Sequence, residues 1–430
     1  MAGKWSFPPV FWLANLIEVL ERFAYYGIYF GFGIYLTSLG FERSQLGWIQ
    51  TGFLLLSYTL PLFSGVLADR YGFKVMLIVA YLAYLPAILL LIFTKSFSGI
   101  ALTMLAIGFA AGLFKPLIIG TVRATTNPEN STLGFGIFYA MVNVGGSLGP
   151  VIAGKLRAIS WDYAFYASAI AIGIMFVLTV LFYREPEREL KPVALWVKLQ
   201  EIRQVLVDRK FAVFLLLLGV GFWIPFWAFF NLCALYVDRS LDTAQLYETI
   251  RNVLGTTVAD FLSHEVEGQR RILGETISHT GYIIMLLQVF VSRAVDRRPA
   301  LPVFYTGLGV MALGFGVLGM AGTGSPASVF LGILLFAIGE MIASPRIQEF
   351  IARLAPKEKA GLYLGANFLA VGIGAFSGAI YTPLYGWFHA SGIPGGVWWV
   401  LALHVLLGIG ALLFFARVAG SFTEVSDGAR

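Results

Sequence analysis

The feature that most constrains this chain is a succession of twelve apolar runs, each long enough to cross a lipid bilayer. A membrane-spanning helix needs roughly 20 predominantly apolar residues. Of the 430 residues, 58% are hydrophobic and only 13% are charged, and the mean hydropathy is +0.79, a composition outside the globular range. The runs lie near residues 10–38, 46–68, 74–94, 98–122, 133–155, 162–183, 211–237, 279–295, 301–321, 327–350, 360–388 and 395–417.

The runs predict helices rather than the strands of a barrel. Gly and Pro inside a spanning helix are tolerated where neighbouring helices satisfy the backbone, whereas a barrel requires short strands of alternating polarity. The fold class is therefore an all-α integral membrane protein with twelve transmembrane helices. The start of the chain, MAGKWSFPP, has no small-residue cleavage site, so we expect it to be retained rather than removed as a signal peptide.

Lys and Arg in the loops predict the orientation in the membrane. Loops that follow even-numbered runs are basic, whereas loops on the other side, such as GTGSPAS and HASGIPGG, have no Lys or Arg. Cytoplasmic loops carry the excess of basic residues, so both termini are expected in the cytoplasm and the protein in the cell inner membrane. The basic loop residues are Arg70, Lys74, Arg184, Arg188, Lys191, Lys198, Arg203, Arg209, Lys210, Arg293, Arg297, Arg298, Arg353, Lys357 and Lys359.

A long basic segment divides the runs into six and six, which predicts two bundles joined by a cytoplasmic linker. Within it, residues 193–207 have apolar side chains at helical spacing and are expected to lie along the membrane surface. The predicted units are an N-terminal six-helix bundle (1–183), the linker (184–210), a C-terminal six-helix bundle (211–420) and a cytoplasmic tail (421–430).

A polar insert over residues 238–279 follows the seventh run, and the topology puts it outside. Its stretch DTAQLYETIRNVLGTTVADFL predicts one amphipathic helix with Asp242 as N-cap and Gln245 three residues later. The insert is either an external, mildly acidic lid or a tolerated insertion.

The two halves carry related loop motifs. GVLADRYGFK follows the second run, and SRAVDRRPAL is a weaker copy after the eighth. Parallel repeats of six spans suit a transporter whose halves rock around a central site. GVLADRYGFK resembles the loop motif of the major facilitator superfamily. The resemblance implies that fold, and it implies conformational gating by Gly65, Asp69 and Arg70 and by their counterparts Asp296 and Arg297.

The first run contains three charges, in the stretch IEVLERFAYYG. At about 100° per residue, its polar side chains fall within a sector of roughly 140°, so this face must look into the protein. Charges at mid-membrane survive by pairing or by lining a wet cavity. Glu18 and Arg22 are spaced i,i+4 and can pair within the helix. The polar residues of this face are Glu18, Glu21, Arg22, Tyr25 and Tyr26.

Two further charges lie inside runs. Lys115 precedes Pro116 in the fourth run, and Glu340 is near mid-depth in the tenth. Together with the three charges of the first run they sum to minus one if all are ionised. A proton, or a cationic group on a substrate, is the natural missing partner.

The same residues carry a closer resemblance. EVLERFAYYG, GLFKP, FYAMVNVGGSLGP and GEMIASPRIQEFIARLAPKEKAGLYLGANFL resemble, in order, signature motifs of the proton-coupled oligopeptide transporters. The resemblance implies that Glu18, Glu21, Arg22 and Lys115 couple proton movement. It also implies that Arg22 and Lys115 meet the anionic end of a substrate and Glu340 the cationic end.

Other polar side chains complete the expected binding site. The seventh run has no acidic residue before Asp238, and Asn231 is its polar side chain at depth. Tyr25, Tyr26, Tyr139 and Asn143 are the remaining candidates for a cavity wall. An alternative is that the charges of the first bundle form a structural cluster that holds its helices together. The aromatic side chains between Phe222 and Phe230 are expected to face lipid or the core.

Several chemistries are excluded. The sequence has no G-x-x-x-x-G-K-[ST] phosphate loop, which argues against an ATP-driven pump. Four scattered His and one Cys, Cys233, form no set with metal-ligand spacing. No enzymatic activity, metal, cofactor or nucleic-acid partner is expected.

The sequence thus predicts a monomeric, proton-coupled secondary transporter that works by alternating access. Its substrates are expected to be small zwitterionic or anionic solutes, most readily di- or tripeptides, with protons and the lipid bilayer as further partners. One alternative is a proton-antiport exporter of amphipathic or drug-like compounds. Another is a transporter-like sensor or partner-binding membrane protein that uses the insert as its active surface.

Overall fold

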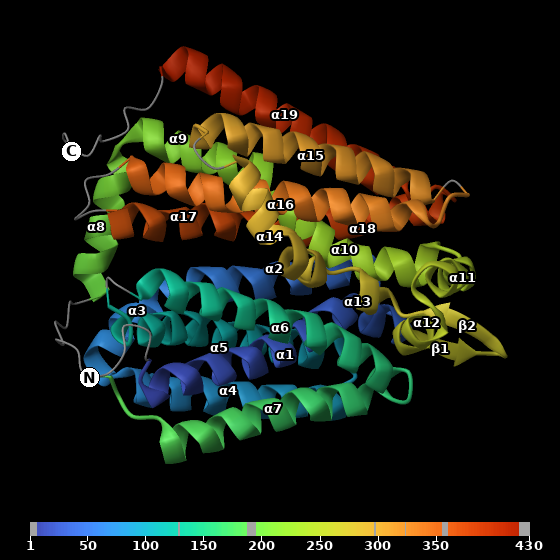
Figure 1. The fold of residues 1–430 in the computed structure, drawn as a ribbon, viewed down its shortest axis with the longest axis horizontal. Helices are drawn as coiled ribbons and strands as arrows, with labels where there is room; N and C mark the ends of the chain where they lie inside the picture. The colour runs from blue at the N-terminus through green and yellow to red at the C-terminus, as the bar shows by residue number, and fades with distance from the viewer. Residues whose placement is uncertain are drawn as a thin grey trace.

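The computed structural model describes residues 7–127, 130–186, 195–295, 298–322, 324–354 and 360–420. The predicted gating residues Asp296 and Arg297, and the tail 421–430, lie outside this part of the chain. Figure 1 shows two helical bundles lying side by side, with α8 running across one end of both.

The first bundle contains the first six predicted spans. Pro61 divides the second span into two helices that are bent by 42°, because Pro has no N–H to continue the helical hydrogen bonding. The helices are α1 (Pro9–Ser38), α2 (Arg43–Thr59), α3 (Pro61–Tyr71), α4 (Phe73–Phe93), α5 (Phe97–Ala124), α6 (Ser131–Arg157) and α7 (Trp161–Phe182).

Close approach of backbones holds this bundle together. Helix α6 packs on α1, where a Cβ at Gly145 would lie 2.8 Å from the Cβ of Arg22. Small residues allow such contacts between membrane helices. At the predicted loop motif, Gly72 has a φ of +90°, and α4 begins there with the Glu185 carboxylate accepting hydrogen bonds from the backbone N–H groups of Phe73 and Lys74. Any residue with a Cβ would be strained at Gly72.

The linker and the second bundle follow. The linker helix α8 (Leu195–Val207) contacts α3 of the first bundle and α17 of the second. A π-helical turn, η1 (Gly219–Trp223), precedes Pro225 inside the seventh span. The other helices of the bundle are α9 (Arg209–Leu218), α10 (Ile224–Ser240), α14 (Gly281–Val295), α15 (Ala300–Ala321), α16 (Ser328–Arg353), α17 (Ala360–Gly374), α18 (Ser377–Ala390) and α19 (Gly396–Ala419).

The insert folds into small helices and one hairpin, so the prediction of a single helix is wrong. Asp242 caps α11 (Thr243–Leu254) as predicted, accepting from the N–H groups of Ala244 and Gln245. The helix then stops at Gly255, whose φ is +89°, and α12 (Thr256–Leu262) starts anew. Strands β1 (Ser263–Val266) and β2 (Gln269–Ile272) pair antiparallel, and α13 (Gly274–Ile277) leads back toward the membrane.

Each of the twelve predicted runs coincides with one helix or with consecutive helices, which confirms the predicted fold class. Within the described residues, nine helices are long and apolar enough to span, and the bent pair α2–α3 makes a tenth. The other two runs are α1, which carries three charges, and α14, which has 15 residues.

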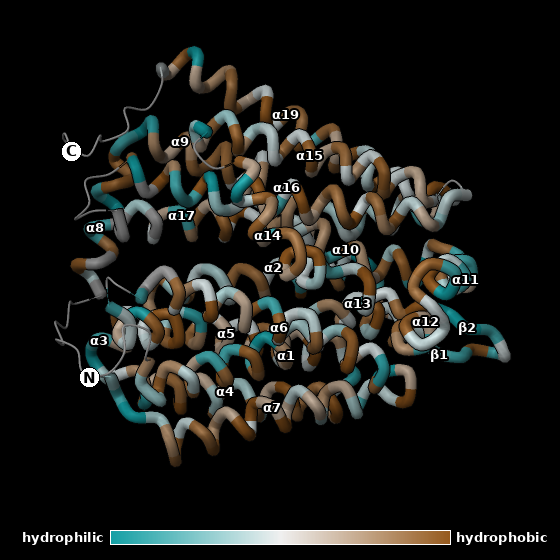
Figure 2. The backbone as a smooth tube through the Cα atoms, in the orientation of Figure 1, coloured by the Kyte–Doolittle hydropathy of each residue, from teal (hydrophilic) through white to brown (hydrophobic). Residues whose placement is uncertain are grey.

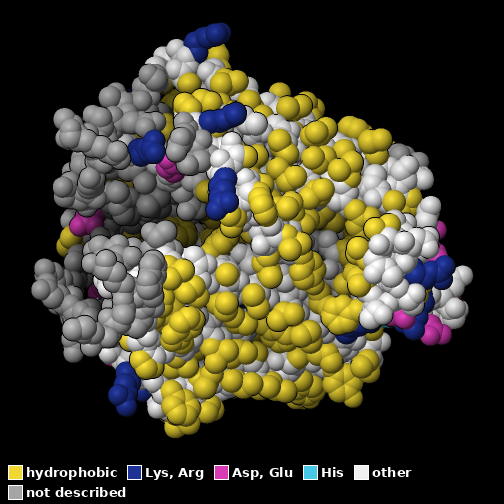
Figure 3. Space-filling view, in the orientation of Figure 1, with side chains coloured by type: hydrophobic (Ala, Val, Ile, Leu, Met, Phe, Trp, Pro, Cys, Tyr) yellow, Lys and Arg dark blue, Asp and Glu magenta, His cyan; other side chains and the backbone are white. Residues whose placement is uncertain are grey.

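The molecule has two distinct ends (Figure 1). Both chain termini and α8 lie at one, which we call the termini end, and α11, α12 and the hairpin lie at the other, the insert end. Hydrophobic residues predominate along the helices of both bundles, with few hydrophilic residues among them (Figure 2). Hydrophobic side chains, yellow in Figure 3, cover the visible flank between the two ends. Charged side chains gather toward the ends. This distribution fits a slab of lipid around the middle of the bundles.

A polar network joins the bundles in the half nearer the insert end. Tyr29 of α1 donates to the Asn231 amide oxygen of α10 over 2.5 Å. Gln50 of α2 donates to the Asn231 carbonyl and accepts from Thr382 of α18. Thr51 accepts from the backbone N–H of Ala379. Buried polar groups that are fully paired in this way hold two surfaces in one register.

Ion pairs close the insert end itself. The Arg157 guanidinium at the end of α6 binds the Glu275 carboxylate of α13 and lies 2.7 Å from the Asp238 carboxylate of α10. Nearby, Lys155 donates to the backbone carbonyls of Asp260 and Ser263 over 2.7 and 2.5 Å. The insert, which belongs to the second bundle, is therefore bound to the first bundle by Arg157 and Lys155.

His264 on β1 lies close to these charges without joining them. Burial, together with the charge of Arg157, lowers the pKa of the His264 imidazole. The side chain is therefore neutral at pH 7 and adds no competing cation beside the Arg157 ion pairs.

Arg157→Gln is expected to loosen the insert. Removing one partner of a buried ion pair costs about 3–5 kcal/mol, because the other charge stays buried and unpaired. Amide hydrogen exchange of residues 243–277 should become at least about tenfold faster, as measured by mass spectrometry, while exchange in α15 stays unchanged.

Arg251→Gln is the matched control. Its partner Glu248 is on the same helix and both side chains are about half exposed, so the pair contributes only about 0–1 kcal/mol. Equal amide hydrogen exchange in the Arg157→Gln variant and the wild type would show that the Arg157 ion pairs do not stabilise the insert.

Candidate functional site

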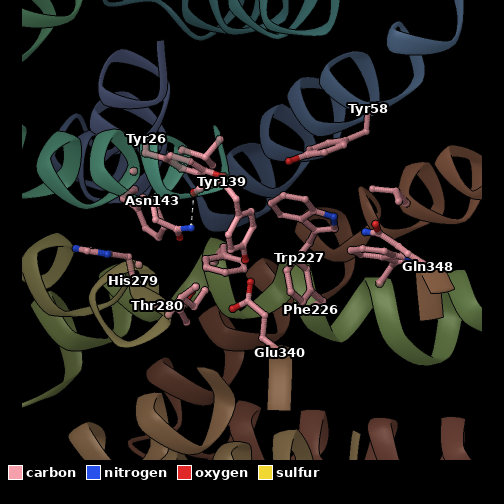
Figure 4. Close-up of a pocket in the computed structure, with 18 of the residues that line it drawn as sticks. Tyr26, Tyr58, Tyr139, Asn143, Phe226, Trp227, His279, Thr280, Glu340 and Gln348 are labelled. Atoms are coloured by element: carbon pink, nitrogen blue, oxygen red, sulfur yellow. Dashed lines mark hydrogen bonds between the residues drawn. The ribbon is translucent and has the colours of Figure 1, made fainter. Parts of the chain in front are cut away.

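A cavity of about 730 Å³ lies between the bundles at mid-length (Figure 4). Its wall is mostly aromatic, with a few polar side chains. It is lined by Tyr26, Phe30, Tyr58, Ile119, Phe135, Tyr139, Val142, Asn143, Gly146, Trp223, Phe226, Trp227, Phe230, His279, Thr280, Gly281, Ile284, Glu340, Gln348, Asn367, Phe368 and Val371.

The cavity opens toward the termini end. The polar network and the ion pairs close the opposite side. In contrast, Phe135, Tyr139 and Phe368 are 37%, 47% and 36% exposed although they line the space between the bundles. A solute of drug size could therefore enter from the termini end in this state.

Glu340 projects into the cavity from the middle of α16 (Figure 4). Among the lining residues it is the one with a formal negative charge, and Lys and Arg do not occur among them. Its Oε2 atom is buried without a hydrogen-bond partner in the described part of the structure, and the Thr280 hydroxyl lies within hydrogen-bonding reach of the carboxyl group. An unpaired carboxylate in such a place attracts a proton or a cation.

The three charges of α1 form a buried cluster beside the cavity rather than in its wall. Arg22 Nε lies 2.6 Å from Glu18 Oε1 and 3.3 Å from Glu21 Oε2. Tyr84 of α4 donates to the other Glu21 oxygen over 3.2 Å. Glu18 and Glu21 are at most 1% exposed and Arg22 is 7% exposed. The predicted i,i+4 pair thus exists, and it sits inside the first bundle.

Lys115 completes this cluster from α5. Its ammonium donates to the Ser57 carbonyl over 3.3 Å and lies 3.6 Å from the Tyr58 ring centroid and 4.9 Å from that of Tyr25. A cation over an aromatic face is stabilised by the ring quadrupole. Because Tyr58 lines the cavity and Lys115 does not, Tyr58 separates the amine from the cavity.

The structure divides the predicted site residues into two groups. Tyr26, Tyr139, Asn143 and Glu340 line the cavity, and Asn143 donates to the Tyr139 carbonyl over 2.9 Å, as the dashed line in Figure 4 marks. The others lie elsewhere: Glu18, Glu21, Arg22 and Lys115 in the buried cluster, Tyr25 between Tyr29 and Phe53, and Asn231 in the polar network.

The predicted gating residues lie at the termini end. Gly65 is in α3, where a Cβ would meet open space. Asp69 and Arg70 are exposed in the last turn of α3, with the Arg70 guanidinium 5.3 Å from the ring centroid of Tyr71.

The prediction that the aromatic run of the seventh span faces lipid or core is wrong for four of its residues. Trp223, Phe226, Trp227 and Phe230 line the cavity, whereas Phe222 and Phe229 are fully buried. Trp227 also packs against Tyr58 of the first bundle with 4.7 Å between ring centroids. The run therefore forms one wall of the binding space.

Sequence reasoning missed His279 and Thr280, which directly precede α14 and line the cavity. The only signal was a polar SHTG stretch directly before an apolar run, and this pattern is also that of an ordinary loop. Their position becomes apparent only once the insert is seen to fold back against α6.

Two bundles of six spans around a central, one-side-open cavity define the architecture of a multi-pass membrane transporter. The sequence matches the family model of the Major Facilitator Superfamily over residues 14–379, and the chain belongs to this family.

Relatives and solved structures agree with this assignment. A "Na(+), Li(+), K(+)/H(+) antiporter" of Planococcus maritimus is 24% identical over 78% of this chain and 80% of its own length. The "Quinolone resistance protein NorA" of Staphylococcus aureus (strain MRSA252) is 28% identical over 156 residues. These are 36% of this chain and 40% of that protein.

Among solved structures, a POT family transporter in complex with 5-aminolevulinic acid superposes with a TM-score of 0.75 at 19% identity, covering 95% of this chain and 96% of that one. A mutant of the nucleoside transporter NupG gives a TM-score of 0.73 at 13% identity, covering 94% and 99%. At these identities the likeness concerns the fold.

Arg22→Met is expected to destabilise the protein strongly. The change leaves Glu18 and Glu21 buried beside each other without the cation that contacts both, and such a loss costs about 3–5 kcal/mol. The apparent melting temperature in detergent should fall by several degrees. Arg123→Met, at an exposed position in the last turn of α5, is the control and should melt like the wild type. A wild-type melting temperature for Arg22→Met would contradict a structural role of the cluster.

Proposed function

We propose that this protein is a proton-coupled secondary transporter that exchanges protons for an amphipathic organic cation by alternating access. The observation that carries the proposal is the carboxylate of Glu340 in an aromatic cavity whose described lining residues include no Lys or Arg. The expected partners are the lipid bilayer, protons and a small-molecule substrate.

The charge balance supports a cation rather than an anion. Glu18 and Glu21 carry two negative charges and Arg22 and Lys115 two positive ones, so the cluster is neutral when all four are ionised. Glu340 is left as the unbalanced charge. A positive substrate would find one carboxylate and several aromatic faces, both of which attract cations.

Competition at Glu340 would couple the two movements. A carboxylate can hold a proton or pair with an organic cation, but it does not do both at once. Protonation from one side of the membrane therefore releases the substrate, and substrate binding on the other side releases the proton. Exchange follows without any further coupling device.

Orientation sets the direction. With the basic loops in the cytoplasm, the termini end is cytoplasmic and the cavity described here is open to the cell interior. Gly65, Asp69 and Arg70 at that end would close it in the opposite state. Proton entry from outside would then drive the cation out of the cell.

Glu340→Gln is expected to remove both proton exchange and cation binding. Quenching of tryptophan fluorescence by ethidium, an amphipathic aromatic cation, should show at least about tenfold weaker binding, since a buried charge pair is worth more than about 1.4 kcal/mol. Trp223 and Trp227 in the cavity wall provide the signal.

Glu349→Gln is the matched control on the same helix. Its carboxylate binds Arg346 and Arg353 and is not in the cavity wall, so ethidium binding and pH-gradient-driven efflux from liposomes should persist. Wild-type ethidium affinity in the Glu340→Gln variant would refute the proposed substrate class.

A second function, import of zwitterionic solutes such as di- or tripeptides together with protons, is favoured by one observation. Lys115 lies directly behind Tyr58, with 3.6 Å from its ammonium to the ring centroid. Rotation of this one side chain would bring a cation opposite Glu340, so that a zwitterion could bridge the cavity.

Lys115→Ala separates the two functions. In peptide import the variant should raise the KM for a dipeptide at least about tenfold, because the substrate carboxylate loses its cation. In cation exchange it should leave ethidium affinity within about twofold, because Tyr58 separates Lys115 from the site. Dipeptide-dependent proton entry into liposomes, read with an internal pH dye, completes the test.

A further inference from the structure

His279 has an unusual position in the same cavity. The side chain is 4% exposed, and neither Nδ1 nor Nε2 has a hydrogen-bond partner among the described residues. Its ring packs between Phe30 of α1, 6.0 Å away, and Tyr282 of α14, 4.5 Å away, measured between centroids. Leaving a buried donor or acceptor unpaired costs about 1–3 kcal/mol. In this state, therefore, the imidazole polar groups contribute nothing to stability.

The surroundings of His279 favour the neutral ring here. An imidazolium carries two N–H donors, and in the described structure neither ring nitrogen has an acceptor. The titratable side chains that share the cavity wall with it are Tyr26, Tyr58, Tyr139 and Glu340, and Tyr282 packs against its ring. The Glu275 carboxylate is held by Arg157, and Thr280 lies between His279 and Glu340 in Figure 4.

The ring also lies where the two bundles meet. His279 belongs to the second bundle and Phe30 to the first, and His279 occupies the side of the cavity nearer the insert (Figure 4). Alternating access requires the bundles to part at that side, which would remove the Phe30 contact and expose the ring to the other side of the membrane. His279 thus faces the cavity in one state and the opposite solution in the other.

We infer that His279 is a second proton-carrying residue of the exchange cycle, acting in turn with Glu340. The inference rests on the proposed function and fixes its stoichiometry. In the step that carries the organic cation across the membrane, ionised Glu340 pairs with the cation and His279 is neutral, so the site carries no net charge. In the return direction both residues hold a proton, and the site carries one positive charge. Each cycle then exchanges one monovalent cation for two protons and moves one net charge.

The test compares charge movement with substrate movement. Wild-type protein in liposomes on a solid-supported membrane should give a transport current, measured as its integrated charge, when ethidium is applied at equal pH on both sides. Ethidium flux measured in parallel should correspond to one charge per molecule exchanged. Gln keeps a donor and an acceptor group but takes up no proton, so in His279→Gln the charge moved per ethidium exchanged should fall at least tenfold.

His404→Gln is the matched control. That imidazole is on α19 and is hydrogen-bonded to the Tyr381 hydroxyl over 2.5 Å, outside the cavity wall, so the current should stay at the wild-type value.

The outcomes separate the inference from the proposed function. An unchanged current in His279→Gln overturns the inference, and so does wild-type exchange that moves no net charge, a measurement that needs no variant. Either result leaves cation–proton exchange through Glu340 intact. Absence of pH-gradient-driven ethidium exchange in the wild type overturns the proposed function itself.

Discussion

The structure depends on how five charges are accommodated where lipid surrounds the protein. Moving a bare charge from water to a low-dielectric interior costs several kcal/mol even after relaxation. In the first bundle two carboxylates are balanced by two cations, with Tyr84 and Ser57 supplying further hydrogen bonds, so this region is neutral when all four groups are ionised. Among the residues that the structure describes, no cation pairs with Glu340. The uncompensated negative charge therefore lies on the Glu340 carboxylate in the cavity, where a proton or a cation from solution can neutralise it.

The interface between the bundles is divided in the same way. Near the insert end it contains a network of hydrogen bonds and ion pairs, from Tyr29 and Asn231 to the Arg157 ion pairs. Around the cavity it is aromatic, as in the contact of Tyr58 with Trp227. Polar contacts can exchange protein partners for water when the bundles part, at little net cost. Aromatic contacts, in contrast, surround Glu340 with apolar side chains, and the lower local polarity strengthens its attraction to a cation.

The spans and the buried charges could be predicted from the sequence because both follow from the cost of polar groups in lipid. Pairings across helices could not. Lys115 was expected in the cavity, yet its ammonium points to the Ser57 carbonyl and the Tyr58 ring, a choice set by packing. The aromatic run of the seventh span has side chains on several faces, so hydropathy alone does not distinguish lipid from cavity. Gly255 permits both a helix and the positive φ that it adopts, and the break lets α11 pack against α12 and β2, contacts that the sequence pattern does not reveal. The position of His279 in the cavity wall could not be predicted, because a polar residue before an apolar run is the normal pattern of a loop.

The carboxylate of Glu340 restricts which forms of the protein can pass through the proposed cycle. To change from one open state to the other, the cavity must pass through a form closed at both ends, in which Glu340 has little water. An ionised and unpaired Glu340 would be costly in that form, whereas a protonated one or one paired with a cation would not. In the proposed exchange only the two occupied forms would cross, so neither species would leak without the other. The same rule applied to a zwitterion would require Lys115 to enter and leave the cavity in each cycle, with the loss of its Tyr58 contact each time. Exchange at a single carboxylate needs no such movement, which is why the observed arrangement favours it.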